Sequence, residues 1–162
     1  MEDLSQKAMD QALRLLSFRA RSEREMADRL AKKGFESDVT DRTVVRLKEL
    51  GLLNDGALAR DMTEVRRRGG RGDHRIRQEL RKRGLASESI ADAMGPVPAE
   101  EGAERAWTAL QKRGARMKGL ARDTAYRRLQ GFLMRQGFGI DETRSALKRF
   151  FSGGPEEEIT EP

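Results

Sequence analysis

Cysteine is absent from this chain of 162 residues, and histidine occurs once. Without cysteine the protein forms no disulfide and no thiolate metal site, which suits a reducing compartment. No apolar run approaches the roughly 20 residues of a membrane span, and the N-terminus begins acidic and amphipathic rather than basic and then apolar. We therefore expect a cytoplasmic protein with neither a signal peptide nor a membrane anchor.

Apolar residues are also scarce, because 36% of the chain is hydrophobic and 37% is charged. One thick globular core is a poor fit to this composition, since so many charged side chains need a large solvated surface. Stacked small helical units provide such a surface. The composition predicts an all-α protein, built as an elongated and curved array of helices.

One pattern of helix ending occurs three times, as LAKKGF at 30–35, LRKRGL at 80–85 and LMRQGF at 133–138. In each, glycine tolerates a left-handed cap and the next apolar residue folds back onto the last turn. A period of about 50 residues holds roughly three helices of usual length. The sequence therefore predicts three tandem three-helix repeats, at 1–51, 52–95 and 96–151, and a flexible acidic tail at 152–162.

Several polar residues are typical helix caps. Ser22 and Glu25 have the spacing of a capping box at the start of the second helix. We expect Ser37, Asp55 and Ser87 to cap the third, fourth and sixth helices.

Apolar spacing then predicts the buried face of each helix. For the first five helices the expected inner residues are Ala8, Ala12, Leu15, Leu16, Met26, Leu30, Val44, Leu47, Leu58, Met62, Val65, Ile76 and Leu80, with Val45 and Leu50 as further candidates.

Positive charge is concentrated in two blocks. Residues 66–83 carry nine Lys or Arg against two acids, a balance of +7 that exceeds the +6 of the whole chain. Residues 105–135 carry nine against one, a balance of +8, so the remainder is acidic. Such sorting favours a basic face for a polyanion or for an acidic groove of a protein, with ordinary solvated helix surfaces as the alternative.

The two blocks predict two cationic strips. With Ile76 and Leu80 facing inward, a step of about 100° per residue turns the cations of the fifth helix outward. Arginine suits phosphate or carboxylate because its planar fork donates two parallel hydrogen bonds. The candidate binding face comprises Arg66, Arg67, Arg68, Arg71, His74, Arg75, Arg77, Arg81 and Lys82 on the first strip, and Arg122, Arg127, Arg128 and Arg135 on the second.

The GGRG segment at 69–72 precedes a helix, as phosphate-binding loops do. No GK[ST] follows, no strand pattern precedes it, and Asp73 would repel a phosphate. We interpret the segment as a flexible hinge, with a backbone contact to a macromolecule as the other option. Catalysis has little support, because neighbouring acids on a helix do not face each other and His74 lies on a basic surface; we expect no enzyme, no metal and no cofactor.

The aromatic residues divide into two groups. Phe35, Trp107 and Phe138 occupy inner positions and are expected in the core. Phe18, Tyr126 and Phe132 are less constrained, so stacking on single-stranded bases stays open for them.

Three segments of the sequence resemble the RecX family of bacterial regulators of the RecA recombinase. They are LSFRARSEREMADRLAKKGF at 16–35, LKELGLLNDGALARDMTEVRRRGGRGDHRIRQELRKRGL at 47–85 and, more loosely, RRLQGFLMRQGF at 127–138. The middle segment is the most specific. One departure is Asn54, where many relatives carry aspartate.

The resemblance implies three tandem three-helix repeats without enzymatic activity, bound within the groove of the RecA filament on DNA. It also implies suppression of ATP hydrolysis, strand exchange and repressor self-cleavage by RecA, and binding of single- and double-stranded DNA. We expect a monomer. The competing hypothesis is a DNA-binding architectural protein that affects RecA only by occupying DNA, and these two differ in their response to salt.

Overall fold

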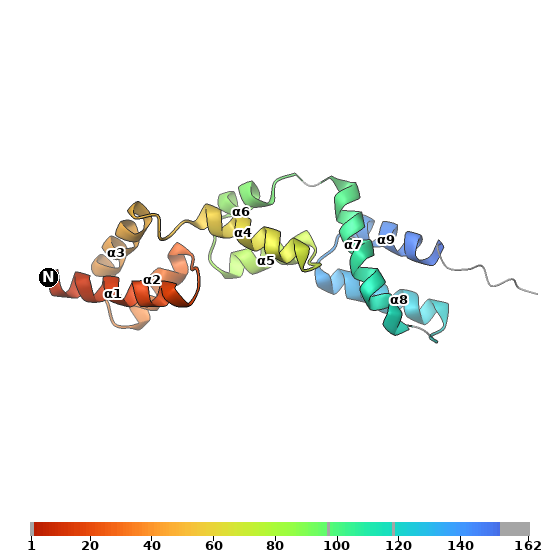
Figure 1. The fold of residues 1–162 in the computed structure, drawn as a ribbon, viewed down its shortest axis with the longest axis horizontal. Helices are drawn as coiled ribbons and strands as arrows, with labels where there is room; N and C mark the ends of the chain where they lie inside the picture. The colour runs from red at the N-terminus through yellow and green to blue at the C-terminus, as the bar shows by residue number, and fades with distance from the viewer. Residues whose placement is uncertain (1, 97, 118, 153–162) are drawn as a thin grey trace, which may run out of the picture. The chain divides into compact units, whose positions relative to one another are not determined.

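The computed structural model describes residues 2–96, 98–117 and 119–152, and over these residues the protein is all-α (Figure 1). The predicted fold class is thus confirmed, with no strand in the described part. The predicted tail at 152–162 lies outside the described residues, except for Ser152, which ends the last helix. The helices are α1 (Glu2–Phe18), α2 (Glu23–Lys32), α3 (Ser37–Glu49), α4 (Asp55–Arg68), α5 (Asp73–Lys82), α6 (Ser87–Met94), α7 (Ala99–Gly114), a short 3₁₀ helix η1 (Ala115–Met117), α8 (Arg122–Gln136) and α9 (Ile140–Ser152).

Packing divides the chain into two units that do not follow the repeats. One unit contains residues 1–65 and 77–95, and the other contains 66–76 and 96–162. The end of α4 and the start of α5 thus pack with the third group of helices. None of the described helices is long and apolar enough to span a membrane.

Each unit has a small apolar core. In the first, α1, α2 and α3 enclose a cluster of buried side chains, namely Ala12, Met26, Leu30, Leu47 and Leu53. In the second, α7 packs most extensively against α9, and the core is formed by Ala106, Ala109, Leu110, Leu129, Leu133, Phe138, Ala146 and Leu147. Phe138 is buried as predicted, whereas Phe35, Trp107 and Phe132 are half-buried at the edges of these clusters.

The recurring helix ending has the predicted geometry in all three places. Gly34, Gly84 and Gly137 have positive φ angles of 90°, 77° and 89°. After each glycine, the next amide donates to the carbonyl five residues back, as Phe35 N does to Leu30 O at 3.3 Å. The same hydrogen bond links Arg71 N to Arg66 O at 3.0 Å, so α4 ends in a defined turn rather than fraying at Gly69 and Gly70.

The helix caps agree with prediction only in part. The capping box is present, with Glu25 N donating to Ser22 Oγ at 3.0 Å and Ser22 N donating to Glu25 Oε2 at 3.1 Å. The predictions for Ser37 and Ser87 are wrong, because the chain enters each helix one residue earlier and these serines are the first helical residues.

Asp55 caps a different helix from the one expected. Asn54 caps α4 instead, since Ala57 N donates to Asn54 Oδ1 at 2.9 Å. Asp55 Oδ1 accepts from Glu23 N at 2.9 Å and so caps the start of α2. Burial raises the pKa of Asp55, and the negative charge of Glu23 adds to the rise against the opposing backbone hydrogen bond.

Three apolar residues expected or considered for the core are exposed, namely Val45, Leu50 and Val65. Buried threonines share the inner faces of α3 and α4 with the apolar residues, at Thr40, Thr43 and Thr63. Thr43 Oγ1 donates to Val39 O at 2.7 Å, which satisfies a hydroxyl that would otherwise be costly to bury. The inner faces of α3 and α4 that apolar residues alone predict therefore differ from the observed inner faces by a rotation about the helix axis.

Candidate nucleic-acid and protein interface

The strip on α5 has the predicted inner residues, because Ile76 and Leu80 are fully buried. His74, Arg81 and Lys82 are exposed, whereas Arg75 and Arg77 are half-buried. The outward positions of α5 therefore offer fewer free cations than the count of charges indicated.

The start of α5 is joined to the end of α8 by a set of hydrogen bonds. Gly72 N donates to Gln136 O at 2.8 Å, and His74 N donates to Gly137 O at 3.1 Å. Arg71 Nη1 donates to Gln136 Oε1 at 2.7 Å. These bonds join residues 71–74 to the end of α8 within one unit, although about 60 residues separate the two segments in the sequence. Arg77, Arg81 and Lys82 of the first strip belong to the other unit.

Arg75 takes part in this junction, because its Nη1 donates to Arg135 O at 3.1 Å. Gly72 is buried, and a Cβ at this position would overlap the backbone of Gly137 and Phe138. The hinge interpretation is therefore wrong at Gly72, which is a fixed contact. The phosphate-loop alternative fails as well, since the amides of Gly72 and His74 already donate to carbonyls.

Asp73 holds two arginines of the basic blocks. Its carboxylate lies 2.7 Å from Arg67 Nη2 and 3.0 Å from Arg105 Nη2, and the three side chains are 14–20% exposed. Burial alone would raise the pKa of Asp73, but the hydrogen bond from Arg67 and the charge of Arg105 outweigh it and lower the pKa. Arg67 is thus an internal ion-pair partner, so it does not belong to the exposed face on which it was predicted.

A second network forms around Glu25 in the other unit. Arg83 Nε lies 2.7 Å and Arg19 Nη2 lies 2.9 Å from Glu25 Oε1, and Arg83 Nη2 also donates to Ala20 O at 2.9 Å. Ser22 Oγ donates to the carbonyl of Arg83. Burial opposes ionisation of Glu25, yet the hydrogen bonds from Arg83 and Arg19 and from the Ser22 amide lower its pKa to about 2. Arg83 therefore ties α5 to α2.

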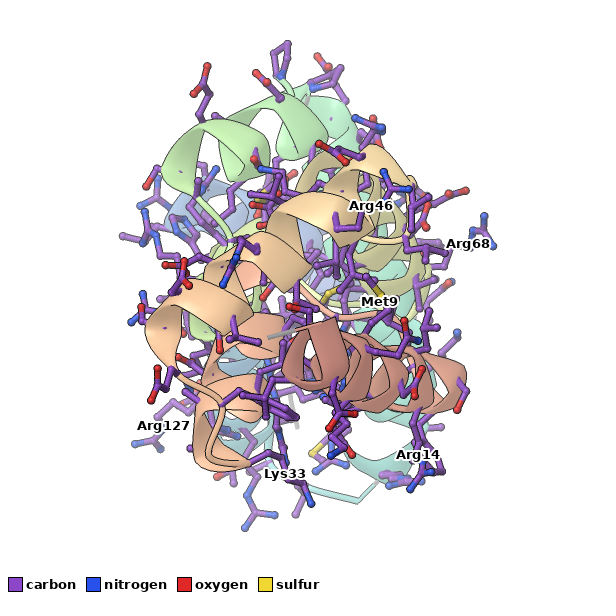
Figure 2. All side chains as sticks on the ribbon, turned by 90° about the vertical axis from the view of Figure 1, so that its left-hand side faces the viewer. Met9, Arg14, Lys33, Arg46, Arg68 and Arg127 are labelled. Carbon is purple, nitrogen blue, oxygen red and sulfur yellow. The ribbon has the colours of Figure 1, made fainter. Side chains whose placement is uncertain are left out.

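The strip on α8 is the more open of the two. Arg122, Arg127, Arg128 and Arg135 are all exposed. Arg127 Nε donates to the Asp123 carbonyl at 3.3 Å, and neither Arg127 nor Arg128 forms an ion pair with a described carboxylate. Arg66 and Arg68 at the end of α4 are exposed as well, and Figure 2 shows the side chains of Arg68 and Arg127 extending away from the ribbon.

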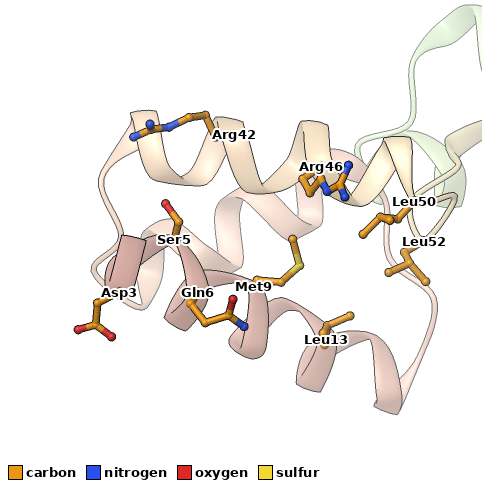
Figure 3. Close-up of a pocket in the computed structure, with 9 residues that line it drawn as sticks. All are labelled: Asp3, Ser5, Gln6, Met9, Leu13, Arg42, Arg46, Leu50 and Leu52. Carbon is orange, nitrogen blue, oxygen red and sulfur yellow. The ribbon is translucent and has the colours of Figure 1, made fainter. Parts of the chain in front are cut away.

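An open groove between α1 and α3 was not predicted from the sequence (Figure 3). Its volume is about 980 Å³, and Met9, Leu13, Leu50 and Leu52 form its apolar part. Polar side chains border it, namely Asp3, Ser5, Gln6, Arg42 and Arg46. The sequence analysis considered Leu50 for the core, whereas the structure leaves it exposed at the edge of this groove. No group of three acids or histidines in the described residues is arranged to hold a metal ion.

Comparisons with known proteins match all three repeats. Family models described as the first, second and third three-helix domains of RecX match residues 8–47, 54–94 and 99–147. The regulatory protein RecX of Halorhodospira halophila is 36% identical over 148 residues, which cover 88% of this chain and 87% of the relative. That of Streptomyces lividans is 34% identical over 127 residues, covering 78% and 68%. The fold resembles the crystal structure of RecX from Lactobacillus salivarius, with a TM-score of 0.83, 21% identity and coverage of 94% of this chain and 99% of that one.

Proposed function

Since the chain belongs to the RecX family of regulatory proteins, we propose that it regulates the RecA recombinase, mainly as an inhibitor. In this proposal the protein binds as a monomer within the groove of the RecA filament on DNA, in the cytoplasm and without a cofactor. It suppresses ATP hydrolysis, strand exchange and the coprotease function of RecA. Its contacts are with RecA and with single- or double-stranded DNA.

The exposed arginines of α8 are the observation that most supports this function. Arg127 and Arg128 are exposed and have no carboxylate partner among the described residues, so they are free to bind an anionic surface. Arginine remains charged at all physiological pH values and binds phosphate or carboxylate in a bidentate manner. We therefore place the principal contact on α8, with Arg81 and Lys82 of α5 as further contributors.

Titration of RecA's ATPase activity on single-stranded DNA tests the proposal. We expect inhibition when the protein is added in stoichiometric amounts to RecA, and binding to the filament in a co-sedimentation assay. No change in ATP hydrolysis or strand exchange, together with no detectable filament binding, would contradict the proposal.

The alternative function is occupancy of DNA alone, and the exposed cations of α8 also favour it. An R127Q/R128Q double variant separates the two functions. Under DNA occupancy, both DNA affinity and RecA inhibition fall, and the salt dependence of binding loses about one unit of slope for each phosphate contact removed. Inhibition that persists after DNA affinity is lost would exclude this alternative.

The matched control is the double variant K32Q/K33Q. Lys32 and Lys33 are adjacent exposed cations outside the two basic blocks, so the control removes the same charge from a different surface. It should leave both DNA binding and RecA inhibition unchanged at moderate salt.

A further inference from the structure

Three aromatic side chains meet where the start of α8 approaches the end of α9. The ring centroids of Tyr126 and Phe151 are 5.6 Å apart, with an angle of 38° between the rings. Phe150 contacts Phe151 edge-on, with centroids 5.3 Å apart and an angle of 76°. Phe150 and Phe151 pack against the core of this unit, which fixes the inner side of the group.

Tyr126 differs from these two phenylalanines because it is not part of the core. It is 37% exposed, and its hydroxyl forms no hydrogen bond with any described residue. Phe151 contacts the Tyr126 ring, and part of the ring is open to solvent. An exposed aromatic ring of this kind can stack against a nucleotide base.

Two arginines lie close to Tyr126 along α8, Arg122 one turn before it and Arg127 directly after it. The Arg122 guanidinium lies 5.6 Å from the Phe151 ring centroid, and its Nη2 donates weakly to Phe151 O at 3.5 Å. Arg127 follows Tyr126 in the chain, and its Nε bonds only the Asp123 carbonyl. Neither arginine forms an ion pair with a carboxylate of the described residues, and the acid on this face is the exposed Asp123.

We propose that Tyr126, supported by Phe151, stacks against an unpaired base of single-stranded DNA, while Arg122 and Arg127 contact its phosphates. Aromatic rings beside cations are the usual means of binding single strands, because every base has a π-face and every nucleotide a phosphate. The inference deepens the proposed DNA contact and rests on it. A duplex cannot use the ring in this way, since its bases are already stacked.

The test compares two labelled oligonucleotides of about 15 nucleotides, one of thymidine and one with abasic sites at every position, by fluorescence anisotropy. They have the same phosphates, so only the thymidine strand can stack. We expect wild-type protein to bind the thymidine strand more tightly.

The informative variants are Tyr126→Phe and Tyr126→Leu, which both keep an apolar side chain against Phe151. Phenylalanine keeps the ring, so binding should be unchanged. Leucine removes the ring, so affinity for thymidine should fall about 5- to 50-fold while affinity for the abasic strand stays the same. Arg127→Gln should weaken both strands equally, and Asp123→Asn should strengthen both.

Met134→Ala is the matched control, because Met134 is an exposed apolar residue of the same helix, 48% exposed. Its binding of both strands should equal that of wild type. Circular dichroism should show that all variants are folded.

Three results would overturn the proposal: equal binding of thymidine by the Phe and Leu variants, equal losses on both strands, or weakened binding to RecA with unchanged binding to oligonucleotides. The RecA ATPase assay distinguishes these from failure of the proposed function. A stacking defect is read without RecA, whereas wild-type protein that leaves RecA unaffected contradicts the proposed function alone.

Discussion

Asp73 and Glu25 each hold two arginines, and at the scale of single residues this decides which cations remain for a partner. Arg67 and Arg105 pair with Asp73, and Arg83 pairs with Glu25. These carboxylates are largely shielded from solvent, so removing one partner costs more free energy than it does in an ordinary surface ion pair. A charge count over a segment therefore overestimates its binding face.

The Glu25 network predicts a loss of stability in acid. Its pKa is lowered from 4.5 to about 2, so the unfolded chain binds more protons between these pH values. The stabilisation is complete above about pH 4.5 and is lost as the pH falls towards 2, a change of about 2 kcal/mol or more. Urea unfolding as a function of pH should show Glu25→Gln less stable than wild type at pH 7, with the two curves converging near pH 2.

Glu49→Gln is the control for this prediction. Glu49 pairs with Arg46 on the surface, where both side chains are more than half exposed. Such a pair contributes little, so the free energy of unfolding should change by less than about 0.5 kcal/mol. A constant difference between wild type and Glu25→Gln at all pH values would contradict the assignment.

Asp73→Asn should destabilise the unit that contains residues 66–76 and 96–162 by about 1–3 kcal/mol. The change leaves Arg67 and Arg105 shielded from solvent without a negative partner. Thermal unfolding measures this change. Asp38→Asn removes a carboxylate from the exposed pair with Arg42 and should have almost no effect. Equal melting temperatures for Asp73→Asn and Asp38→Asn would show that the Asp73 network contributes no more than a surface pair.

Only part of this residue-scale detail could be predicted from the sequence. The helical period correctly turned Ile76 and Leu80 inward and Arg81, Lys82, Arg127 and Arg128 outward, because exposure follows from local geometry. Partners could not be predicted in this way. Arg83 and Glu25 are 58 residues apart, and which side chains meet over such a distance depends on the tertiary packing of several helices.

At the scale of helices, the residue before α5 lies directly against the turn that ends α8. A Cβ at position 72 would overlap the backbone of Gly137 and Phe138, so this position requires glycine. Gly137 itself has a positive φ. The sequence marked Gly72 as part of a loop but contained no local signal that another backbone lies against it.

Gly72→Ala should therefore destabilise the protein by about 2 kcal/mol or more, since the added methyl group overlaps backbone that cannot move freely. Gly56→Ala is the opposite case. Gly56 lies in α4 and its added Cβ would have only ordinary contacts at 3.5 Å, so stability should rise by about 0.5–1 kcal/mol. Chemical denaturation of both variants measures these changes, and destabilisation of equal size in the two would contradict the steric explanation.

Helices were more predictable than their faces. The order of the described helices followed mainly from the repeated glycine endings, which act within a few residues. The faces of α3 and α4 were predicted less well because buried Thr43 and Thr63 resemble surface residues in a hydropathy pattern. Their burial depends on the space that the neighbouring helices leave beside them.

At the scale of the whole chain, net charge is the property that most affects association with DNA. Residues 153–162 include four glutamates and no cation, so a chain that ends at Ser152 has a net charge of +10 instead of +6. We expect this shortened chain to bind single-stranded DNA at least about threefold more tightly at low salt, because less negative charge opposes the approach to phosphate.

Anisotropy titrations at several salt concentrations measure this effect. The control replaces the same four glutamates by glutamine at full length, which separates charge from length. Both changes should strengthen binding to a similar extent, and the gain should disappear at high salt. Unchanged affinity at low salt in both variants would contradict a role for the charge of these residues.

The hydrogen bonds from Gly72 and His74 to the end of α8 also determine where the protein can be cut and recombined. A fragment that begins at Pro96 carries the whole third repeat in sequence, yet it lacks residues 66–76, which belong to the same packed unit. A chimera that exchanges third repeats between relatives should therefore fold well only if the end of α4 and the start of α5 are exchanged with them. We therefore expect residues 66–76 to be exchanged together with the third repeat. A crossover at the boundary of the repeat would separate them from the helices against which they pack.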